Sequence, residues 1–208
     1  TLGTVSMIAI ILIVLTAYLA GSIASAIIVC KLLGLPDPRQ GGSGNPGATN
    51  VLRLGGKKAA AITLLGDVLK GLLPVLLAAW LVPQPEAIAA AAVAAFLGHL
   101  FPVFFGFKGG KGFATALGAA AGLSWLAVGA MAATWVLVAA VSRISSLSAL
   151  IAALLLPVYL WWFTGFAAFW IGGVVITVMI FVRHQANVVR LLAGTEPRIG
   201  QKKAPAPG

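Results

Sequence analysis

Four stretches of this chain contain no Lys, Arg, Asp or Glu, and together they cover more than half of its length: residues 1–30, 87–107, 112–142 and 144–182. A helix needs about 20 apolar residues to cross the hydrocarbon core of a bilayer, so each stretch is long enough for at least one crossing. Charged residues make up 9% of the chain, whereas about a quarter of the residues are charged in soluble domains. We therefore predict an all-α, polytopic integral membrane helix bundle that forms a single domain over residues 1–208.

The charged residues between these stretches predict how the bundle is oriented. The chain has 14 Lys and Arg but only 4 Asp and Glu, and the basic residues lie in short clusters at the ends of the apolar runs, as in loops that stay cytoplasmic. The net charge of +10 is then a topology signal, and no nucleic-acid partner is predicted. The first run is expected to be a transmembrane helix and not a cleaved signal peptide, because positive charge follows it at Lys31 instead of preceding it.

If every basic cluster is cytoplasmic, an even number of crossings must separate neighbouring clusters, which predicts seven transmembrane helices. After the run at 1–30, helices are expected at about 59–82, 86–105, 113–122 and 125–141, and residues 144–182 are expected to divide into two at 163–165. The short helix at 113–122 could enter only part of the bilayer, which is tolerated where protein surrounds its end. The N-terminus is then outside and the C-terminus cytoplasmic. Of the 14 basic residues, only Lys70 is not cytoplasmic, and residues 204–208 are expected to be disordered.

Four polar segments fall on the cytoplasmic side in this arrangement. They combine glycines, hydroxyl and amide side chains with Lys and Arg, and they contain almost no carboxylates: residues 41–53, 108–115, 143–146 and 183–196. Glycines let backbone N–H groups approach a ligand closely, and a guanidinium group binds phosphate through a fixed fork of donors. We expect the four segments to meet in one anion-binding site.

Nucleotide and metal chemistry do not fit these segments. Residues 42–47 have the G-x-G-x-x-G spacing of a dinucleotide site, but a membrane helix precedes them where that site requires a strand. Lys111 is not part of a Walker loop, because Phe105 stands where a glycine is required and Gly112 stands where Ser or Thr binds Mg²⁺. The few acidic residues and the two distant histidines show no ligand spacing of a metal centre, so neither a metal nor another cofactor is predicted.

Three of the polar segments resemble the motifs of one known family. These are Ser-Gly-Asn-Pro-Gly-Ala-Thr-Asn at 43–50 followed by Arg53, the stretch 98–115 that contains Lys-Gly-Gly-Lys-Gly-Phe-Ala-Thr, and the stretch 183–196 that begins Arg-His-x-x-Asn. In this order, and over nearly the whole chain, they resemble the bacterial acyl-phosphate:glycerol-3-phosphate acyltransferases. Only Pro46 and Phe113 stand at positions where the family varies.

The resemblance implies transfer of a fatty acyl group from acyl phosphate to the 1-hydroxyl of glycerol 3-phosphate. The products would be lysophosphatidic acid and inorganic phosphate, made at the cytoplasmic face of the bacterial inner membrane as the first acylation step of phospholipid synthesis. The implied partners are the two substrates, membrane lipids and a soluble acyl-phosphate-forming enzyme in transient contact. Phosphate is a good leaving group from a mixed anhydride, so positioning two anions and neutralising developing charge could supply most of the acceleration.

Roles follow for individual residues as hypotheses. The residues expected to act in catalysis are Ser43, Arg53, Lys111, His184 and Asn187, and those expected to bind substrate or phosphate are Gly44, Asn45, Gly47, Asn50, Gly109, Gly110, Gly112, Ser146 and Arg183. One phosphate would be held by the segment around Ser43 together with Arg53. The other would be held by Lys111 and the N–H groups of its neighbouring glycines.

The glycerol hydroxyls would be oriented by Ser146, His184 and Asn187. Two groups are candidates for accepting the hydroxyl proton. His184 is one, because an unperturbed imidazole titrates near neutral pH, and a phosphate oxygen of the substrate is the other.

Other interpretations remain open for parts of this pattern. An organophosphate transporter or binding protein would also need cationic groups in a helix bundle, although transporters place polar residues near the midplane and show internal repeats. Several polar residues could have structural roles: Lys108 as a headgroup anchor, Ser145 and Ser146 as caps of a helix that starts near 147, His99 as a strut between helices, and Asp67 with Lys70 as an intrahelical pair.

Overall fold

The structure is a computed structural model that describes residues 7–200. Within this range all regular structure is helical, as predicted. The elements are α1 Met7–Gly21, α2 Ser25–Leu32, α3 Ala48–Leu81, α4 Pro85–Leu100, the 3-10 helix η1 Val103–Phe105, α5 Phe113–Leu123, α6 Trp125–Ser142, α7 Ser145–Thr164, α8 Ala167–Arg183 and α9 Gln185–Leu192. The expected disordered tail at 204–208 lies outside the described residues.

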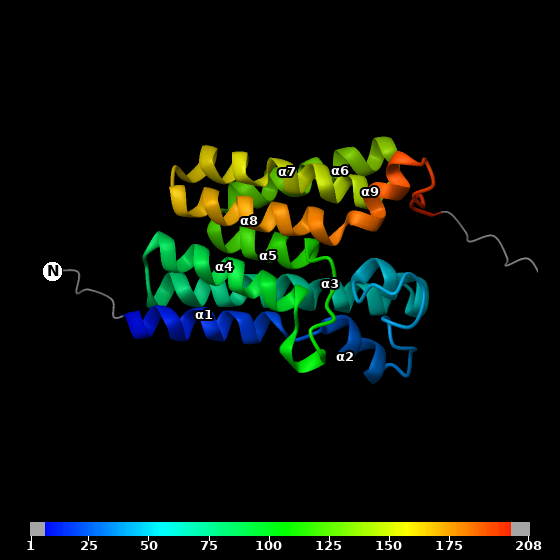
Figure 1. Cartoon of the computed structure of the whole chain (residues 1–208), viewed down its shortest axis with the longest axis horizontal. Coiled ribbons are helices and arrows are strands. Elements are labelled where there is room, and N and C mark those ends of the chain that lie inside the picture. The colour runs from blue at the N-terminus through cyan, green and yellow to red at the C-terminus, as the bar shows by residue number, and fades with distance from the viewer. Residues whose placement is uncertain (1–6, 201–208) are drawn as a thin grey trace, which may run out of the picture.

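The long helices lie side by side along the longest axis of the molecule, and the chain reverses direction at each connection from α3 to α8 (Figure 1). Among the described residues, 5 helical stretches are long and apolar enough to cross a membrane, and α8 passes the same test together with α9, which bends away by 64°. Helix α5 is apolar but shorter. The predicted total of seven counts α5 as a crossing, and this count stays a prediction.

Most of the predicted connections are where Pro, Gly or Ser interrupts the apolar runs. Helix α3 ends at Leu81 and α4 begins at Pro85, where a turn was expected at 82–86. Ser124 separates α5 from α6, and its side-chain oxygen accepts a hydrogen bond from the Ala127 N–H at 3.2 Å, which caps α6. Helix α7 ends at Thr164 next to Gly165, the residue at which the run 144–182 was expected to divide.

The first apolar run is not one helix, contrary to expectation. It breaks between Gly21 and Ser25, where α1 ends and α2 begins. Helix α4 packs so closely at this point that a Cβ on Gly21 would lie 2.0 Å from the Ala95 carbonyl oxygen. The ammonium of Lys70 also donates a hydrogen bond of 2.8 Å to the Ile23 carbonyl oxygen inside the break. Tertiary contacts therefore replace the helical hydrogen bonds that continue elsewhere in the run.

The second helix begins 11 residues before its expected start near 59, at Ala48. Non-helical backbone at Gly56, with φ 76° and ψ −172°, divides α3 into a short first part and a long second part. The residues from Ala48 to Arg53, which were expected in a polar loop, are therefore helical. Their side chains are fixed relative to one another instead of being carried by a flexible turn.

Small residues allow the helices to approach closely. A Cβ on Gly118 of α5 would lie 2.0 Å from the Val68 carbonyl oxygen of α3. The core around α5 is built from alanines together with larger side chains such as Phe96, Leu156 and Ile176, all fully buried. This packing fixes α5, which begins at the polar end of the molecule.

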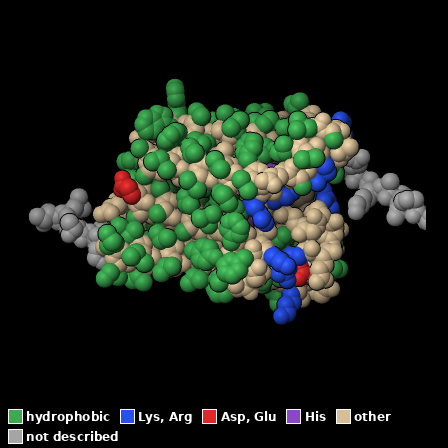
Figure 2. Space-filling model, viewed as in Figure 1, with side chains coloured by type: hydrophobic (Ala, Val, Ile, Leu, Met, Phe, Trp, Pro, Cys, Tyr) green, Lys and Arg blue, Asp and Glu red, His purple; other side chains and the backbone are tan. Residues whose placement is uncertain are grey.

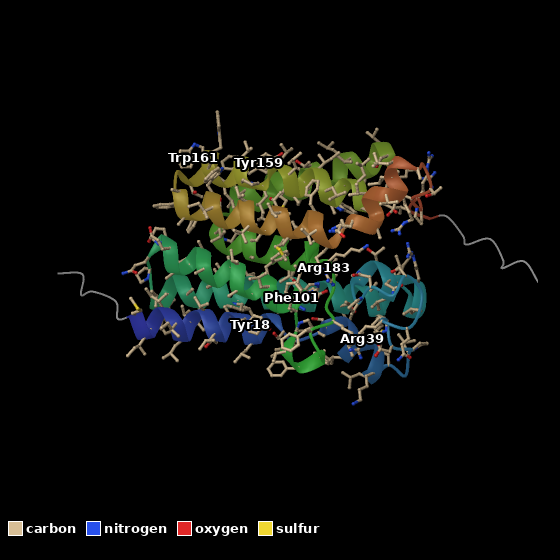
Figure 3. All side chains as sticks on the ribbon, viewed as in Figure 1. Tyr18, Arg39, Phe101, Tyr159, Trp161 and Arg183 are labelled. Carbon is tan, nitrogen blue, oxygen red and sulfur yellow. The ribbon has the colours of Figure 1, made fainter. Side chains whose placement is uncertain are left out.

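The surface is divided into an apolar body and a basic end. Hydrophobic side chains cover most of the face shown in Figure 2, and Lys and Arg gather at the end where α2, α9 and the start of α3 lie. Large exposed aromatic side chains mark the opposite end: Trp161 lies there, far from Arg183 (Figure 3), and Trp80 and Trp162 are 78% and 80% exposed. Such a belt is typical of a membrane interface.

Candidate active site

Segments that are far apart in the sequence meet at the basic end. The stretch 108–112, called the glycine loop below, contacts the first polar segment near Pro46 and accepts hydrogen bonds from Arg183 at the end of α8. The Ser146 hydroxyl donates to Glu196 Oε1 at 2.6 Å, which joins the last two segments. All four predicted polar segments are therefore in contact with a neighbour at one end of the bundle.

The first segment is shaped by Asn50. Its side-chain oxygen accepts a hydrogen bond from the Ser43 N–H at 2.8 Å, and its amide nitrogen donates to the carbonyl oxygens of Pro38 and Gly41 at 2.8 and 3.0 Å. At Gly42, φ is +64° and a Cβ would lie 2.1 Å from the Asn50 side-chain oxygen, so only glycine fits there. The buried amide of Asn50 therefore organises the loop backbone, and the predicted contact of Asn50 with substrate stays a prediction.

This organised loop presents Ser43 and Gly44 to solvent, with Asn45 and Gly47 partly exposed beside them. Arg53 projects from the first part of α3 and is also exposed. Its charge lies close enough to Lys111 to affect the pKa of that residue. No hydrogen bond among the described residues joins Ser43 or Arg53 to Lys111. The two halves of the predicted site are therefore near each other but not bonded.

The glycine loop leads into the N-terminus of α5. The Arg183 guanidinium donates to the carbonyl oxygens of Gly109 and Gly110 at 2.8 and 3.2 Å and lies over the Phe101 ring, 5.8 Å from its centroid. Figure 3 shows Arg183 next to Phe101. The N–H groups of residues 109–112 donate no hydrogen bond to any residue in the range 7–200. Unpaired amides at a helix N-terminus suit an anion.

Lys111 begins a network of polar side chains. Its Nζ donates to the Asn187 side-chain oxygen, and the Asn187 amide donates in turn to Glu196 Oε1 at 2.5 Å. The same Oε1 accepts from the Ser146 hydroxyl at 2.6 Å, while Oε2 accepts from Arg190 Nε at 2.7 Å. Lys111, Asn187 and Ser146, three of the predicted site residues, are thus brought together by Glu196.

Sequence reasoning did not include Glu196 among the site residues. One feature of the sequence could have indicated it: Glu196 is the one carboxylate in the basic segment 183–196, which also contains the predicted catalytic residues His184 and Asn187. Its side chain is 7% exposed. Burial alone would raise the pKa of Glu196, but the hydrogen bonds from Ser146, Asn187 and Arg190 outweigh it and hold the pKa below its usual range. Glu196 is therefore a fixed anion and not a proton donor.

The pKa of Lys111 is lowered, mainly because burial disfavours its charged form. The Glu196 carboxylate opposes this shift, and the positive charges of Arg190, Arg53 and Arg183 add to it. The ammonium thus lies in a surplus of positive charge. An incoming phosphate would supply the negative charge that this environment lacks.

His184 lies in the turn between α8 and α9, outside the spanning helices, and is 4% exposed. Its Nδ1 is 2.8 Å from the Ile180 carbonyl oxygen. A carbonyl can only accept, so Nδ1 carries the proton and Nε2 has the free lone pair. Burial lowers the pKa of His184 to about 4, so the ring is neutral at physiological pH. It can accept a hydrogen bond but does not add to the positive charge.

Of two structural roles predicted from the sequence, one is wrong and one is confirmed. Helix α7 begins at Ser145, and its N-cap Ile144 has no side-chain cap, so neither serine caps the helix in the expected way. The Asp67–Lys70 pair is confirmed, with 2.8 Å between Lys70 Nζ and Asp67 Oδ1.

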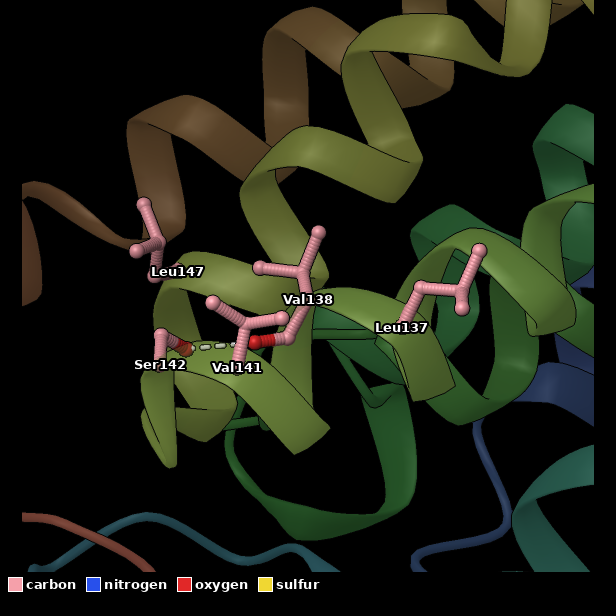
Figure 4. Close-up of a pocket in the computed structure, with 5 residues that line it drawn as sticks. All are labelled: Leu137, Val138, Val141, Ser142 and Leu147. Atoms are coloured by element: carbon pink, nitrogen blue, oxygen red, sulfur yellow. Dashed lines mark hydrogen bonds between the residues drawn. The ribbon is translucent and has the colours of Figure 1, made fainter.

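Apolar grooves elsewhere on the surface offer no such chemistry. One lies between α6 and α7 and is lined by Leu137, Val138, Val141, Ser142 and Leu147 (Figure 4). Its single hydroxyl, on Ser142, donates to the Val138 carbonyl oxygen at 2.7 Å. The charged side chains and the unpaired backbone amides described above lie instead at the polar end of the bundle.

The chain is similar to proteins of one known family. Residues 11–194 match the model of a protein family described as glycerol-3-phosphate acyltransferase. A relative of that name from Thioalkalivibrio sulfidiphilus is 62% identical over 190 residues, which cover 91% of this chain and 93% of the relative. Another from Methylococcus capsulatus is 57% identical over 188 residues, with 90% and 94% covered.

Two crystal structures share the fold. Both are of PlsY (YgiH), an integral membrane glycerol 3-phosphate acyltransferase, one in a glycerol 3-phosphate form and one in a lysophosphatidic acid form. Their TM-scores are 0.88 and 0.84, their identities 37% and 36%, and the similarity covers 92% of this chain and 96% of each of theirs.

Proposed function

The chain belongs to the glycerol-3-phosphate acyltransferase family, a family of membrane enzymes that form lysophosphatidic acid, and we propose that its acyl donor is acyl phosphate. The observation that carries this proposal is the half-buried Lys111 with unpaired backbone N–H groups on either side of it, inside a surplus of positive charge. A reaction that joins two phosphate-bearing substrates needs such surroundings. A thioester donor would bring no phosphate to the reacting carbonyl.

In the proposed reaction, the 1-hydroxyl oxygen of glycerol 3-phosphate attacks the carbonyl carbon of acyl phosphate. The new C–O ester bond forms, the bond from the carbonyl carbon to the phosphate oxygen breaks, and phosphate leaves with the electron pair. Lys111 and the N–H groups of Gly109, Gly110 and Gly112 are suited to hold one phosphate. Arg53 with the exposed loop at Ser43 is suited to hold the other, so both anions are positioned and their charge is balanced.

The glycerol hydroxyls meet the neutral side chains of the network. His184 Nε2 has a free lone pair and can accept the hydrogen bond of the attacking hydroxyl, while Asn187 and Ser146 are fixed by Glu196. With a pKa of about 4, His184 is a weak base, and the proton can be released to a phosphate oxygen as the ester forms. The proposed role of His184 is therefore to orient the hydroxyl.

The proposed topology has seven crossings, an outside N-terminus and a cytoplasmic C-terminus in a bacterial inner membrane. Support comes from the alternating directions of the helices and from the basic end opposite the tryptophan belt (Figures 1 and 2). The active site is then cytoplasmic, where glycerol 3-phosphate and a soluble acyl-phosphate-forming enzyme can reach it. Exposed Lys57 and Lys58 on the same end add positive charge that would favour contact with an acidic protein.

The test uses purified protein in detergent with glycerol 3-phosphate and either palmitoyl phosphate or palmitoyl-CoA. The proposal expects inorganic phosphate and lysophosphatidic acid in equal amounts with palmitoyl phosphate, and no ester with palmitoyl-CoA. Turnover with palmitoyl-CoA but not with palmitoyl phosphate would refute the proposal that acyl phosphate is the donor. Binding of glycerol 3-phosphate without any turnover would instead support the transporter that the sequence left open.

A further inference from the structure

A cluster of charged side chains is buried between α3 and α4 and takes no part in the reaction proposed above. Asp67 and Lys70 of α3 are 2% and 7% exposed, and His99 of α4 is 6% exposed. Asp67 Oδ1 lies 2.8 Å from Lys70 Nζ and 3.6 Å from His99 Nδ1. The cluster thus links two neighbouring helices, and through the Lys70 bond to Ile23 it also reaches the break between α1 and α2.

Stability alone does not explain these charges. A buried ion pair loses its hydration, and replacing it with apolar side chains is often neutral or stabilising. The cluster is not optimised either, since His99 Nδ1 is buried and has no hydrogen-bond partner in the described range. Polar groups retained under these conditions point to a positional role.

The other edge of the His99 ring faces the glycine loop. A Cβ on Gly110 would lie 2.4 Å from His99 Nε2, and a Cβ on Gly109 would lie 2.0 Å from the His99 carbonyl oxygen. The loop backbone therefore rests directly on this residue from the α4 side. Arg183 holds the carbonyl oxygens of the same two glycines from α8. Lys111 is the next residue, so its position depends on both supports.

We propose that His99, anchored by the Asp67–Lys70 ion pair, is a positioning residue that sets the glycine loop and thereby Lys111 for acyl transfer. This inference rests on the proposed function. His99 lies against the backbone of the loop, so it would act through Lys111. A shift of about 1 Å in a group that holds a reacting substrate can lower the rate about 100-fold, so the packing of one imidazole ring is enough to matter.

The test is a double-mutant cycle between His99→Ala and Gly110→Ala, measured as kcat/KM for glycerol 3-phosphate together with the melting temperature. Alone, each substitution is expected to lower kcat/KM about 100-fold. In the His99→Ala background the alanine at 110 no longer meets the ring, so its further effect is expected to be less than about threefold because contacting residues are not additive. The approach of this Cβ to the Pro46 carbonyl oxygen, at 3.0 Å, is present in both backgrounds and cancels.

Two comparisons separate positioning from stability. Thr177→Val removes a buried hydrogen bond of 2.6 Å to the Ala153 carbonyl oxygen, away from the loop, and is expected to lower the melting temperature without changing kcat/KM. His99→Gln retains a side-chain nitrogen toward Gly110 and is expected to recover part of the activity lost in His99→Ala.

Independent, multiplicative effects of His99→Ala and Gly110→Ala would overturn the inference. So would His99 variants that lose melting temperature but keep kcat/KM, as Thr177→Val is expected to do. An inactive wild-type enzyme would instead count against the proposed function, so the two failures are distinguishable.

Discussion

Lys111 is the residue on which the site depends most directly. Lys111→Met removes the ammonium beside the unpaired amides and is expected to lower kcat about 100-fold, the effect typical of losing one donor to developing charge. The matched control is Lys108→Met, three residues earlier in the same loop region, where the side chain is exposed. Steady-state kinetics on the two variants should show a loss only at 111. Equal losses would mean that general positive charge, not the position of Lys111, matters.

Glu196 is expected to act through the residues it fixes. Glu196→Ala leaves the Asn187 amide and the Ser146 hydroxyl without their shared acceptor. Each unpaired buried group is expected to lower the free energy of unfolding by about 1–3 kcal/mol. We expect a lower melting temperature and a KM for glycerol 3-phosphate raised about tenfold, since one lost orienting hydrogen bond is worth roughly 1.4 kcal/mol. Glu86→Gln, an exposed acid at the opposite end, is the control and should change neither quantity.

His184 gives a pH dependence of stability. Its pKa is about 4 in the folded protein, below the ordinary value of 6.5. Between these values the unfolded chain binds a proton that the folded protein does not, so the free energy of unfolding falls as pH decreases from 6.5 toward 4. Thermal melts over this range should show a shallower slope for His184→Gln than for wild type. Identical slopes would contradict the buried neutral imidazole.

The same variant tests whether His184 is a base. His184→Gln keeps a side-chain group that can accept the hydrogen bond of the substrate hydroxyl, so the orienting role predicts a retained kcat and a raised KM. Loss of kcat by more than about 100-fold, within the range of general-base catalysis, would restore His184 as the proton acceptor.

At the scale of elements, the break in the first span depends on a buried charge. Lys70→Met would leave the Asp67 carboxylate without its ammonium partner and would remove the bond from Lys70 to the Ile23 carbonyl oxygen. It is expected to destabilise the fold by about 3–5 kcal/mol. Adding Asp67→Asn removes the unpaired charge, so the double variant should recover much of the melting temperature. A Lys70→Met protein as stable as wild type would show that the pair does not anchor the break.

The ends of helices were predicted well from the sequence where local residue types determine them, and poorly where tertiary contacts determine them. The turns at 82–86, 122–125 and 163–165 follow from Pro, Gly and Ser, which interrupt helices in any context. The break after Gly21 also contains Gly and Ser, but glycines occur inside unbroken helices such as α5 as well, so this signal did not single out the break. What distinguishes it is close packing on Ala95 and the bond from Lys70. The role of Glu196 was not predicted because its partner Ser146 is 50 positions away, and no spacing rule connects two residues at that separation.

At the scale of the whole molecule, charge distribution and substrate chemistry support each other. Figure 2 shows an apolar body and a basic end. In the proposed reaction the apolar body would keep the acyl chain in the bilayer, and the basic end would hold the two phosphates. The apolar body and the basic end were both predictable. A membrane crossing requires a long apolar run, and the positive-inside rule requires an even number of crossings between neighbouring basic clusters. The network that orients the residues within the basic end was not predictable, because it joins side chains from the glycine loop, from α7, from α9 and from the segment after α9, which only the fold brings together.

Sidedness of turnover in sealed vesicles tests the central claim most directly, since it requires both the reaction and a cytoplasmic site. Palmitoyl phosphate is placed in the membrane, glycerol 3-phosphate, which does not cross it, is added outside, and released inorganic phosphate is measured. Inside-out vesicles should turn over at once, and right-side-out vesicles only after detergent is added. Turnover in intact right-side-out vesicles, or none in either orientation, would contradict a cytoplasmic acyl-transfer site.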